Sequence, residues 1–441
     1  MSQPGDKVKL ITEKEEVEGL LIPSPKKEIV ILKLDNGYNV GYPKEQIKDI
    51  VVIKEFKKLP KPDKTQVSSN KKIIQKNKKL PTISILHTGG TIASKVDYRT
   101  GGVSSDFSPE ELISLFPELS DIANIESELI SQMWSDDLRF AHFSIIAKAI
   151  EKHAKKGVKG IIVGIGTDNL SVASAALSFI VEKTPIPILL VGAQRSSDRG
   201  SSDAGMNLIC AAEFITKTDF SDVAICMHGS SSDEACFILP ANKIYKLHSS
   251  RRDAFKAVNT EAIARVGYND RKVVFLKSKD KVENSNMKPK TLVIKPKMEE
   301  KVGLLKIHVN MFPEQFAFFK GYNGLIIEGT GLGHTPGQIP NEAATIHKKI
   351  YPAIKEVIDS GCVVVMTTQC IFGGVNMNVY DKGRDLLELG VISGKDMLAN
   401  TALVKLSWLL ANYPKEVKEK MESNLRGEIN ETISYEEDFL K

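Results

Sequence analysis

A short apolar run that stops abruptly at two glycines is the feature that most constrains the fold of this chain. Residues 83–94 read ISILHTGGTIAS, so a β-prone run meets the sequence Thr-Gly-Gly-Thr. A buried parallel strand that ends in a tight loop has this pattern. Open α/β sheets bind ligands outside the carboxyl ends of their strands, and adjacent glycines let the backbone approach a ligand closely. We therefore expect Gly90 and Thr91 to border a ligand crevice, unless the glycines only form a turn.

From residue 81 onward, short β-branched runs alternate with amphipathic helical stretches. Strand candidates such as GIIVGIG, ILLVGA, LIIEG and VVVMTTQ are separated by helix candidates such as residues 140–155 and 171–181. This order is typical of parallel sheets covered by helices on both faces. Because the charged segment 278–301 interrupts the pattern, we expect two α/β lobes. The larger lobe would cover residues 81–285 and the smaller C-terminal lobe residues 300–441.

The first 80 residues have a different composition. Residues 1–55 contain short strand candidates (VKLI, VEGLLI, EIVILKL, YNVGY) and a hairpin signal, Asn-Gly at 36–37, which predict a small SH3-like β-barrel as an accessory domain. Residues 56–80 are rich in Lys, Pro, Ser and Asn and predict a linker. Residues 54–79 hold ten lysines and two acidic residues, a local charge of +8 in a chain of net charge +5. Such a segment either solubilises a tether or attracts nucleic-acid phosphates.

Bulk composition excludes several classes of protein. Hydrophobic residues make up 42% of the chain and charged residues 26%, which is typical of soluble globular proteins. Without a long apolar run or a signal-peptide h-region, we expect a cytoplasmic protein. The five cysteines form no CxxC pair and the eight histidines lack metal-ligand spacing. This pattern predicts neither a disulfide framework nor a metal site.

Three further segments carry polar side chains where predicted strands end or helices begin. The strand GIIVGIG runs into Thr167-Asp168, and the helix that follows would favour an ionised carboxylate at its N-terminus, although the same pair could simply cap that helix. Ser135 lies in the motif WSDD ahead of another helix. Lys246 begins the segment KLHSSRRDAF, which follows a further strand candidate. These residues are candidates for a common site.

Taken together, these motifs resemble the bacterial-type L-asparaginase family over residues 81–413. The segment 88–94 is similar to the first threonine motif of that family, and GTD at 166–168 is similar to the second. The chain departs from the family at Ile165, where histidine is usual, and at Asn169, where threonine is usual. The resemblance implies catalytic roles for Thr91, Thr167, Asp168 and Lys246, substrate contacts for Tyr98, Ser135, Gly90 and Gly166, and no metal.

The chemistry implied is amide hydrolysis by a hydroxyl nucleophile, which needs a nearby group that removes its proton. The nearest histidine in sequence, His87, should point to the opposite strand face from Thr88. We therefore assign Lys246 as the proton acceptor, oriented by Asp168. Thr91 would be the acyl acceptor and Thr167 part of the relay, although the sequence also permits the two threonines to exchange roles.

With the N-terminal barrel and the basic linker, the whole chain resembles the D subunits of archaeal glutamyl-tRNA(Gln) amidotransferases. That resemblance implies hydrolysis of glutamine or asparagine to release ammonia, without a cofactor in this polypeptide. A partner, the E subunit, would use the ammonia, with ATP and Mg, to convert Glu-tRNA(Gln) into Gln-tRNA(Gln). The expected assembly is a homodimer of this chain within a D2E2 complex. The alternatives are a stand-alone L-asparaginase or glutaminase and a non-enzymatic protein that binds a ligand or RNA.

Overall fold

The computed structural model describes most of the 441-residue chain. The described residues are 2, 6–22, 24, 28–34, 39–54, 77–89, 95–96, 103–104, 116–195, 202–276 and 289–432. Gly90, Thr91 and Tyr98 lie outside the described residues, as does most of the predicted linker. The predicted site residues at positions 135, 166–168 and 246 are among the described residues.

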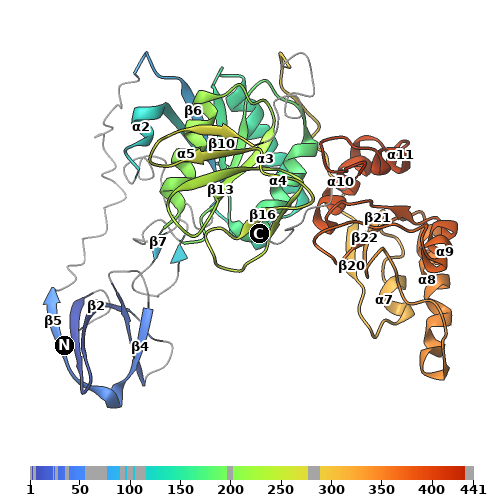
Figure 1. Cartoon of the computed structure of the whole chain (residues 1–441), viewed down its shortest axis with the longest axis horizontal. Coiled ribbons are helices and arrows are strands. Elements are labelled where there is room, and N and C mark those ends of the chain that lie inside the picture. The colour runs from blue at the N-terminus through green and yellow to red at the C-terminus, as the bar shows by residue number, and fades with distance from the viewer. Residues whose placement is uncertain are drawn as a thin grey trace, which may run out of the picture.

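The N-terminal segment forms the short strands that its sequence predicts (Figure 1). They are β1 (Lys7–Thr12), β2 (Glu16–Ile22), β3 (Ile29–Lys33), β4 (Asn39–Pro43) and β5 (Ile47–Lys54), with a 3-10 turn at Lys44–Gln46. All neighbours are antiparallel, in the order β4-β3-β2-β1-β5. Val8, Leu10 and Leu32 are fully buried between them. Lys33 pairs with Asn39, which confirms the hairpin predicted there, although its turn lies outside the described residues.

The larger lobe is built on an eight-stranded sheet in the order β18-β17-β14-β13-β12-β10-β6-β9. Its strands are β6 (Thr82–His87), β9 (Asn124–Leu129), β10 (Gly160–Gly164), β12 (Ile188–Val191), β13 (Val223–His228), β14 (Ala235–Pro240), β17 (Ala264–Gly267) and β18 (Val273–Phe275). The five strands from β13 to β9 are parallel, as predicted. The other three pair antiparallel with their neighbours. Residues 229–234 and 268–272 are short enough for hairpins but not for crossovers, whereas β14 and β17 are joined by the longer segment 241–263.

Helices cover both faces of this sheet because its buried strands present apolar side chains on alternate sides. On β10, Ile161 and Val163 belong to the core under α3 (Phe140–Ala154) and α4 (Leu170–Ile180), whereas Ile162 belongs to the opposite core. That opposite core lies under α5 (Ala204–Lys217) and the short α2 (Leu119–Ile122) (Figure 1). The predicted α/β layering is therefore confirmed for this lobe.

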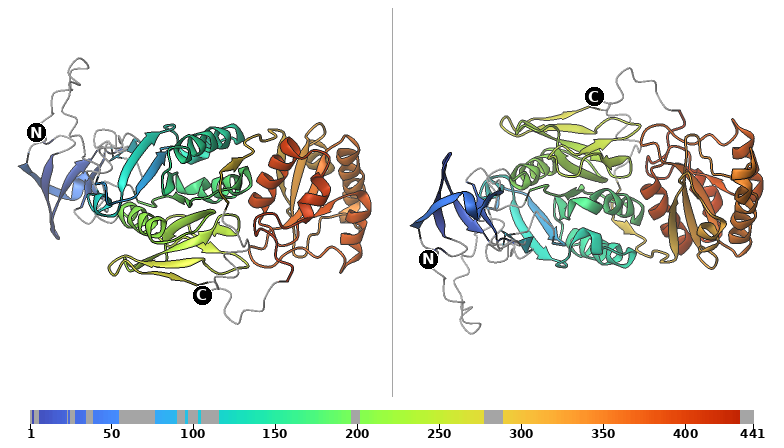
Figure 2. Two further views of the ribbon diagram at one scale, coloured as in Figure 1. Left: turned by 90° about the horizontal axis from the view of Figure 1, so that it is seen from above. Right: turned by 90° about the horizontal axis from the view of Figure 1, so that it is seen from below.

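The smaller lobe contains a four-stranded parallel sheet in the order β20-β21-β22-β23. Its strands are β20 (Val302–Lys306), β21 (Gly324–Gly329), β22 (Val363–Thr368) and β23 (Ile392–Ser393). Its helices are α7 (Pro313–Ala317), α8 (Ile350–Asp359), α9 (Asp381–Leu389), α10 (Ala399–Asn412) and α11 (Val417–Glu422), with a 3-10 segment at Glu342–Lys349. Figure 2 shows this lobe beside the larger one along the long axis of the molecule.

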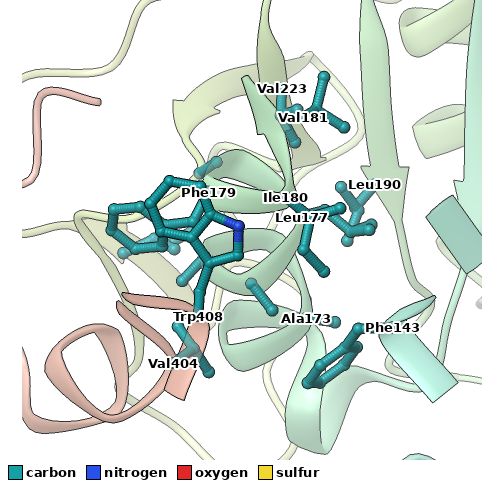
Figure 3. Packing of buried hydrophobic residues seen from close by; sticks show 14 of the residues in the cluster. Phe143, Ala173, Leu177, Phe179, Ile180, Val181, Leu190, Val223, Val404 and Trp408 are labelled. Atoms are coloured by element: carbon teal, nitrogen blue, oxygen red, sulfur yellow. The ribbon is translucent and has the colours of Figure 1, made fainter. Parts of the chain in front are cut away.

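The two lobes share a core where α10 packs against α4. Trp408 of α10 lies with its ring centroid 5.9 Å from that of Phe179 on α4, and its indole N–H donates to the carbonyl of Lys295 (Figure 3). Three small ribbons complete the fold: β7 (Lys95–Val96) with β8 (Val103–Ser104), β11 (Val181–Lys183) with β19 (Val293–Ile294), and β15 (Ile244–Lys246) with β16 (Phe255–Ala257). Within the described residues, no helix is both long and apolar enough to cross a membrane.

Candidate active site

Three neighbouring parallel strands end together at one edge of the larger sheet. His87 of β6 pairs with Gly164 of β10, which pairs in turn with Val191 of β12. Each strand then runs into a loop of small and polar residues, namely Thr88-Gly89, Gly166-Thr167-Asp168 and Gly192-Ala193-Gln194. Ligands of open α/β sheets bind outside such strand ends, and the side chains that meet at this edge come from separate loops.

Two glycines allow these loops to lie close together. Gly89 has a φ of +91°, and a Cβ added there would lie 2.6 Å from the carbonyl oxygen of Met133. A Cβ at Gly166 would lie 2.8 Å from Oγ of Ser135. Real Cβ atoms are not found at such separations, so a larger residue would separate the loops. The first threonine motif therefore needs glycine at position 89, both for the positive φ and for the close approach to the Met133 backbone.

Lys246, Thr167 and Asp168 meet directly at this edge. The ammonium nitrogen Nζ of Lys246 lies 3.0 Å from Oγ1 of Thr167 and 2.8 Å from Oδ1 of Asp168. Thr167 is 8% exposed, and the side chain of Lys246 is 14% exposed, whereas that of Asp168 is 72% exposed. A hydroxyl shielded by protein thus contacts an amine whose other partner is a carboxylate open to solvent.

The lysine reaches the threonine because it lies on a separate hairpin. Lys246 ends β15 and pairs directly with Phe255 of β16, so residues 247–254 form the hairpin loop. Within that loop, Arg251 binds Asp253 through two hydrogen bonds of 2.8 Å. Arg252 binds Asp233, which lies outside the hairpin, so each of the two loop arginines is paired with a carboxylate.

Ser135 contacts Asn169, which follows the second threonine motif and is one of the two positions at which the chain departs from the asparaginase pattern. Asn169 donates from its side-chain Nδ2 to the Ser135 carbonyl at 2.8 Å and from its backbone N–H to Ser135 Oγ at 3.4 Å. Both residues lie in 3-10 turns, Ser135–Asp137 and Thr167–Asn169. The other departure, Ile165, is fully buried in the hydrophobic core. Both departures therefore have structural roles in this chain.

Gln194 is a site residue that sequence reasoning missed. Its side-chain Oε1 accepts a hydrogen bond from Thr167 Oγ1 at 3.3 Å, and its backbone N–H donates to Asp203 at 3.0 Å. Its Nε2 atom is buried and has no hydrogen-bond partner among the described residues. The available signal was its place in the polar loop that follows the strand ILLV, which lies next to β10 in the sheet.

His87 is not available as a base for this site. It is 1% exposed, and burial lowers the pKa of its imidazole to about 4, so the ring is neutral near pH 7. Neither ring nitrogen has a hydrogen-bond partner within the part of the chain that the structure describes. Among those same residues, no group of three or more His, Cys, Asp or Glu side chains is placed to hold a metal ion.

Family models match all three parts of the chain. Residues 82–281 match the model described as Asparaginase, N-terminal, and residues 301–421 match the Glutaminase/Asparaginase C-terminal domain. Residues 2–53 match the GatD N-terminal domain. Among solved structures, the thermostable L-asparaginase from Thermococcus kodakarensis superposes with a TM-score of 0.69 at 28% identity, covering 80% of this chain and 100% of that one.

Curated relatives match nearly the whole length. The D subunit of glutamyl-tRNA(Gln) amidotransferase from Pyrococcus furiosus is 42% identical over 436 residues, which is 96% of this chain and 94% of the relative. The protein of the same name from Methanococcus maripaludis is 42% identical and covers 98% of this chain and 99% of its own length. The relative from Archaeoglobus fulgidus, which also has this name, is 40% identical over 435 residues, or 98% of this chain and 96% of its own length. The chain therefore belongs to the family of glutamyl-tRNA(Gln) amidotransferase D subunits.

Proposed function

We propose that this chain hydrolyses the side-chain amide of glutamine, or of asparagine, and releases ammonia for the conversion of Glu-tRNA(Gln) into Gln-tRNA(Gln). The observation that carries the proposal is the Lys246 amine, which lies within hydrogen-bond distance of both Thr167 and Asp168. A hydroxyl, an amine and a carboxylate in contact are the parts of a proton relay for a hydroxyl nucleophile. Membership of the D-subunit family supports the amidotransferase reaction.

Proton transfer in this relay has a defined direction. As an ammonium, Lys246 can only donate hydrogen bonds, so the Thr167 hydroxyl accepts one from it and donates one to Oε1 of Gln194. Once Lys246 is neutral, its lone pair can accept the proton of a threonine hydroxyl, and Asp168 stabilises the ammonium that forms. The exposed Asp168 connects the relay to solvent.

We assign Thr91 as the acyl acceptor. Its hydroxyl would attack the amide carbonyl, the relay would take its proton and return it to the leaving ammonia, and water would then hydrolyse the ester. Backbone N–H groups of Gly90 and Gly166 are suited to hold the developing oxyanion, and Ser135 and Tyr98 complete the substrate contacts. Thr91, Gly90 and Tyr98 lie outside the described residues, so these three assignments rest on the sequence.

The catalytic residues and the segments proposed to meet partner molecules lie in different domains of the chain. In this proposal, residues 1–55 are the accessory domain, 56–80 the linker, 81–285 the catalytic lobe and 300–441 the smaller lobe. The N-terminal domain and linker serve the encounter with the E subunit or with glutamylated tRNA in a D2E2 complex. The E subunit would use ATP and Mg, and this chain would need no cofactor.

Ammonia release tests the activity. The chain should release ammonia from glutamine or asparagine, and turnover should rise when glutamylated tRNA and the E subunit are added. Turnover that does not change on addition of glutamylated tRNA and the E subunit would favour a stand-alone asparaginase or glutaminase. Failure to release ammonia under any of these conditions would reject the proposal.

Salt dependence tests the linker. Replacing five lysines within residues 56–80 by glutamine should lower the affinity of the complex for tRNA and flatten its dependence on salt, because each phosphate contact releases counterions. Glutamine hydrolysis should not change. An unchanged salt slope would mean that the lysines only keep the tether in solution.

A further inference from the structure

The hairpin that carries Lys246 is not paired with a strand of the main sheet, although Ile244 and Phe255 are buried in the core of the larger lobe. β15 and β16 form a two-stranded sheet of their own, with three residues in each strand. An isolated two-stranded hairpin is at best marginally stable in water. The position of Lys246 relative to Thr167 must therefore be fixed by contacts other than strand pairing to the larger sheet.

A buried ion pair joins the start of this hairpin to the smaller lobe. Lys243, the residue before β15, binds Asp396, which lies between β23 and α10. Both side chains are only 3% exposed, and the second carboxylate oxygen of Asp396 accepts the backbone N–H of Asn430 at 2.9 Å. Lys243 also closes the hairpin, because its carbonyl accepts the N–H of Val258 at 2.9 Å.

The other strand of the hairpin is tied to the same lobe. Asn259 follows β16 and has a φ of 54°. Its side chain exchanges two hydrogen bonds with the backbone of Gly373, at 2.7 Å and 2.9 Å. Asn430 donates to the Asn259 carbonyl at 2.7 Å. Asn242 adds a third connection, since it donates to the Arg426 carbonyl and accepts from the Thr401 hydroxyl, both at 2.7 Å.

The threonine side of the relay is held by the larger lobe. Ser174 of α4, the helix that starts after Thr167 and Asp168, donates to the carbonyl of Ala241 at 2.6 Å. Thr167 thus belongs to the framework of the larger lobe, whereas the base of the hairpin is bonded to both lobes. Lys246 lies three residues beyond Lys243, about 10 Å along an extended strand, so a shift at Lys243 reaches the lysine nitrogen directly.

We propose that Asn242, Lys243 and Asn259, bonded respectively to Arg426, Asp396 and Asn430, form an inter-lobe clamp that positions Lys246 against Thr167 and Asp168. The smaller lobe is then part of the catalytic apparatus although it supplies no group to the relay. A buried ion pair is weak evidence for stability but can hold one arrangement, because loss of either partner leaves an uncompensated charge. The inference rests on the proposed amide hydrolysis.

The test compares two variants of the full chain that weaken the same inter-lobe interface. Lys243→Met removes the ion pair of the clamp. Trp408→Leu removes the Phe179 contact and the indole hydrogen bond to Lys295, which do not involve the hairpin. Melting temperatures are recorded for both, and kcat and KM for glutamine are measured well below the lower of the two, with glutamylated tRNA and the E subunit present.

Lys243→Met should lower kcat about 10- to 100-fold and leave KM within about twofold, because a displacement near 1 Å in a catalytic group has that effect. Trp408→Leu should lower the melting temperature and leave kcat within about twofold of wild type. Asn259→Gly is a milder variant that folds even where Lys243→Met does not, because glycine accepts the positive φ while the bonds to Gly373 are lost. It should lower kcat about three- to tenfold.

The outcomes separate the two proposals. Equal kcat in all variants, equal losses in Lys243→Met and Trp408→Leu, or a rise in KM alone would overturn the clamp while the amidase function stands. An inactive wild-type chain would reject the amidase function itself, and the clamp with it.

Discussion

The parallel strands of the two main sheets are alike in architecture, but the residues at their carboxyl ends make different contacts. In both lobes, central strands run into loops of glycine and threonine, such as Gly166-Thr167 after β10 and Gly329-Thr330 at the end of β21. In the larger lobe the threonine hydroxyl contacts an amine from a distant hairpin. The contact with a lysine from a distant hairpin therefore distinguishes the Thr167 strand end from its counterpart in the smaller lobe.

In the smaller lobe the corresponding polar groups hold the loops together. The Thr368 hydroxyl, at the end of β22, donates to the Gly331 carbonyl at 2.6 Å. The side-chain amide of Gln369 donates to the carbonyls of Glu328 and Ile307. Their hydrogen-bonding capacity is used by neighbouring backbone, as is common for buried polar side chains. The hydroxyl of Thr167 instead bonds only side chains, those of Lys246 and Gln194, within the described structure.

The largest expected difference between the sheets is in catalysis. Lys246→Met should lower glutamine turnover on the order of 10³-fold, because removal of one member of a relay is nearly as damaging as removal of all. Thr368→Val, at the matched strand end of the smaller lobe, should leave turnover within about threefold. The measurement is steady-state ammonia release by folded variants, with circular dichroism as the check on folding.

Free ammonia sharpens this result. Added to a complex that contains Lys246→Met, it should restore amidation of Glu-tRNA(Gln), since only the ammonia source is lost. The same rescue is expected for Thr91→Ala, Thr167→Ala and Asp168→Ala. Near-wild-type turnover by any of these four variants would remove that residue from the relay, and failed rescue would indicate that the variant damages the complex.

Sequence reasoning located those parts of the site that depend on local pattern. A junction between a strand and a loop depends on consecutive residues. The ends of β6 and β10, and the position of Thr167-Asp168 after β10, could therefore be predicted. Parallel pairing then brings neighbouring junctions to one edge. The antiparallel strands of the larger sheet were harder to predict, because an apolar run does not reveal the direction of the strand with which it pairs.

Long-range contacts could not be predicted in the same way. Gln194 was visible only as one polar residue in a polar loop, and its contact with Thr167 depends on the order of β10 and β12. The Lys243–Asp396 pair joins residues 153 positions apart. Lysine is rarely buried, so its sequence neighbourhood predicts a solvated side chain. Only the packing of the two lobes shows otherwise.

Acid should lower the free energy of unfolding of the larger sheet by about 2 kcal/mol more than that of the smaller sheet. Burial lowers the His87 pKa from 6.5 to about 4, so between these values the unfolded chain binds more protons than the folded one. The contribution of His87 is therefore fully present above pH 6.5 and is lost as pH falls toward 4. Between pH 7 and pH 5 the loss is about 2 kcal/mol.

Hydrogen exchange at the two pH values, corrected for intrinsic rates, would reveal this loss. Amides of β6 and β10 should lose protection at pH 5, whereas those of β21 and β22, which contain no histidine, should change less. His87→Leu should remove the pH dependence in β6. Equal acid sensitivity of the two sheets, or its persistence in His87→Leu, would show that other groups govern the response.

The smallest change in structure is one methyl group placed at a strand end in each lobe. A Cβ at Gly192 would lie 2.8 Å from Cγ2 of Thr167, and one at Gly329 would lie 2.6 Å from Sδ of Met366. Both additions overpack a buried junction and should destabilise the protein by about 1–3 kcal/mol. Gly192→Ala should also lower kcat about tenfold, because the methyl group displaces the hydroxyl that Lys246 contacts, whereas Gly329→Ala should leave kcat within about twofold. Thermal melts and kcat measured on the same samples separate these effects. If both variants lost turnover in proportion to their loss of stability, catalysis would not depend on the exact position of Thr167. The strand ends of the two lobes would then not differ in their effect on turnover.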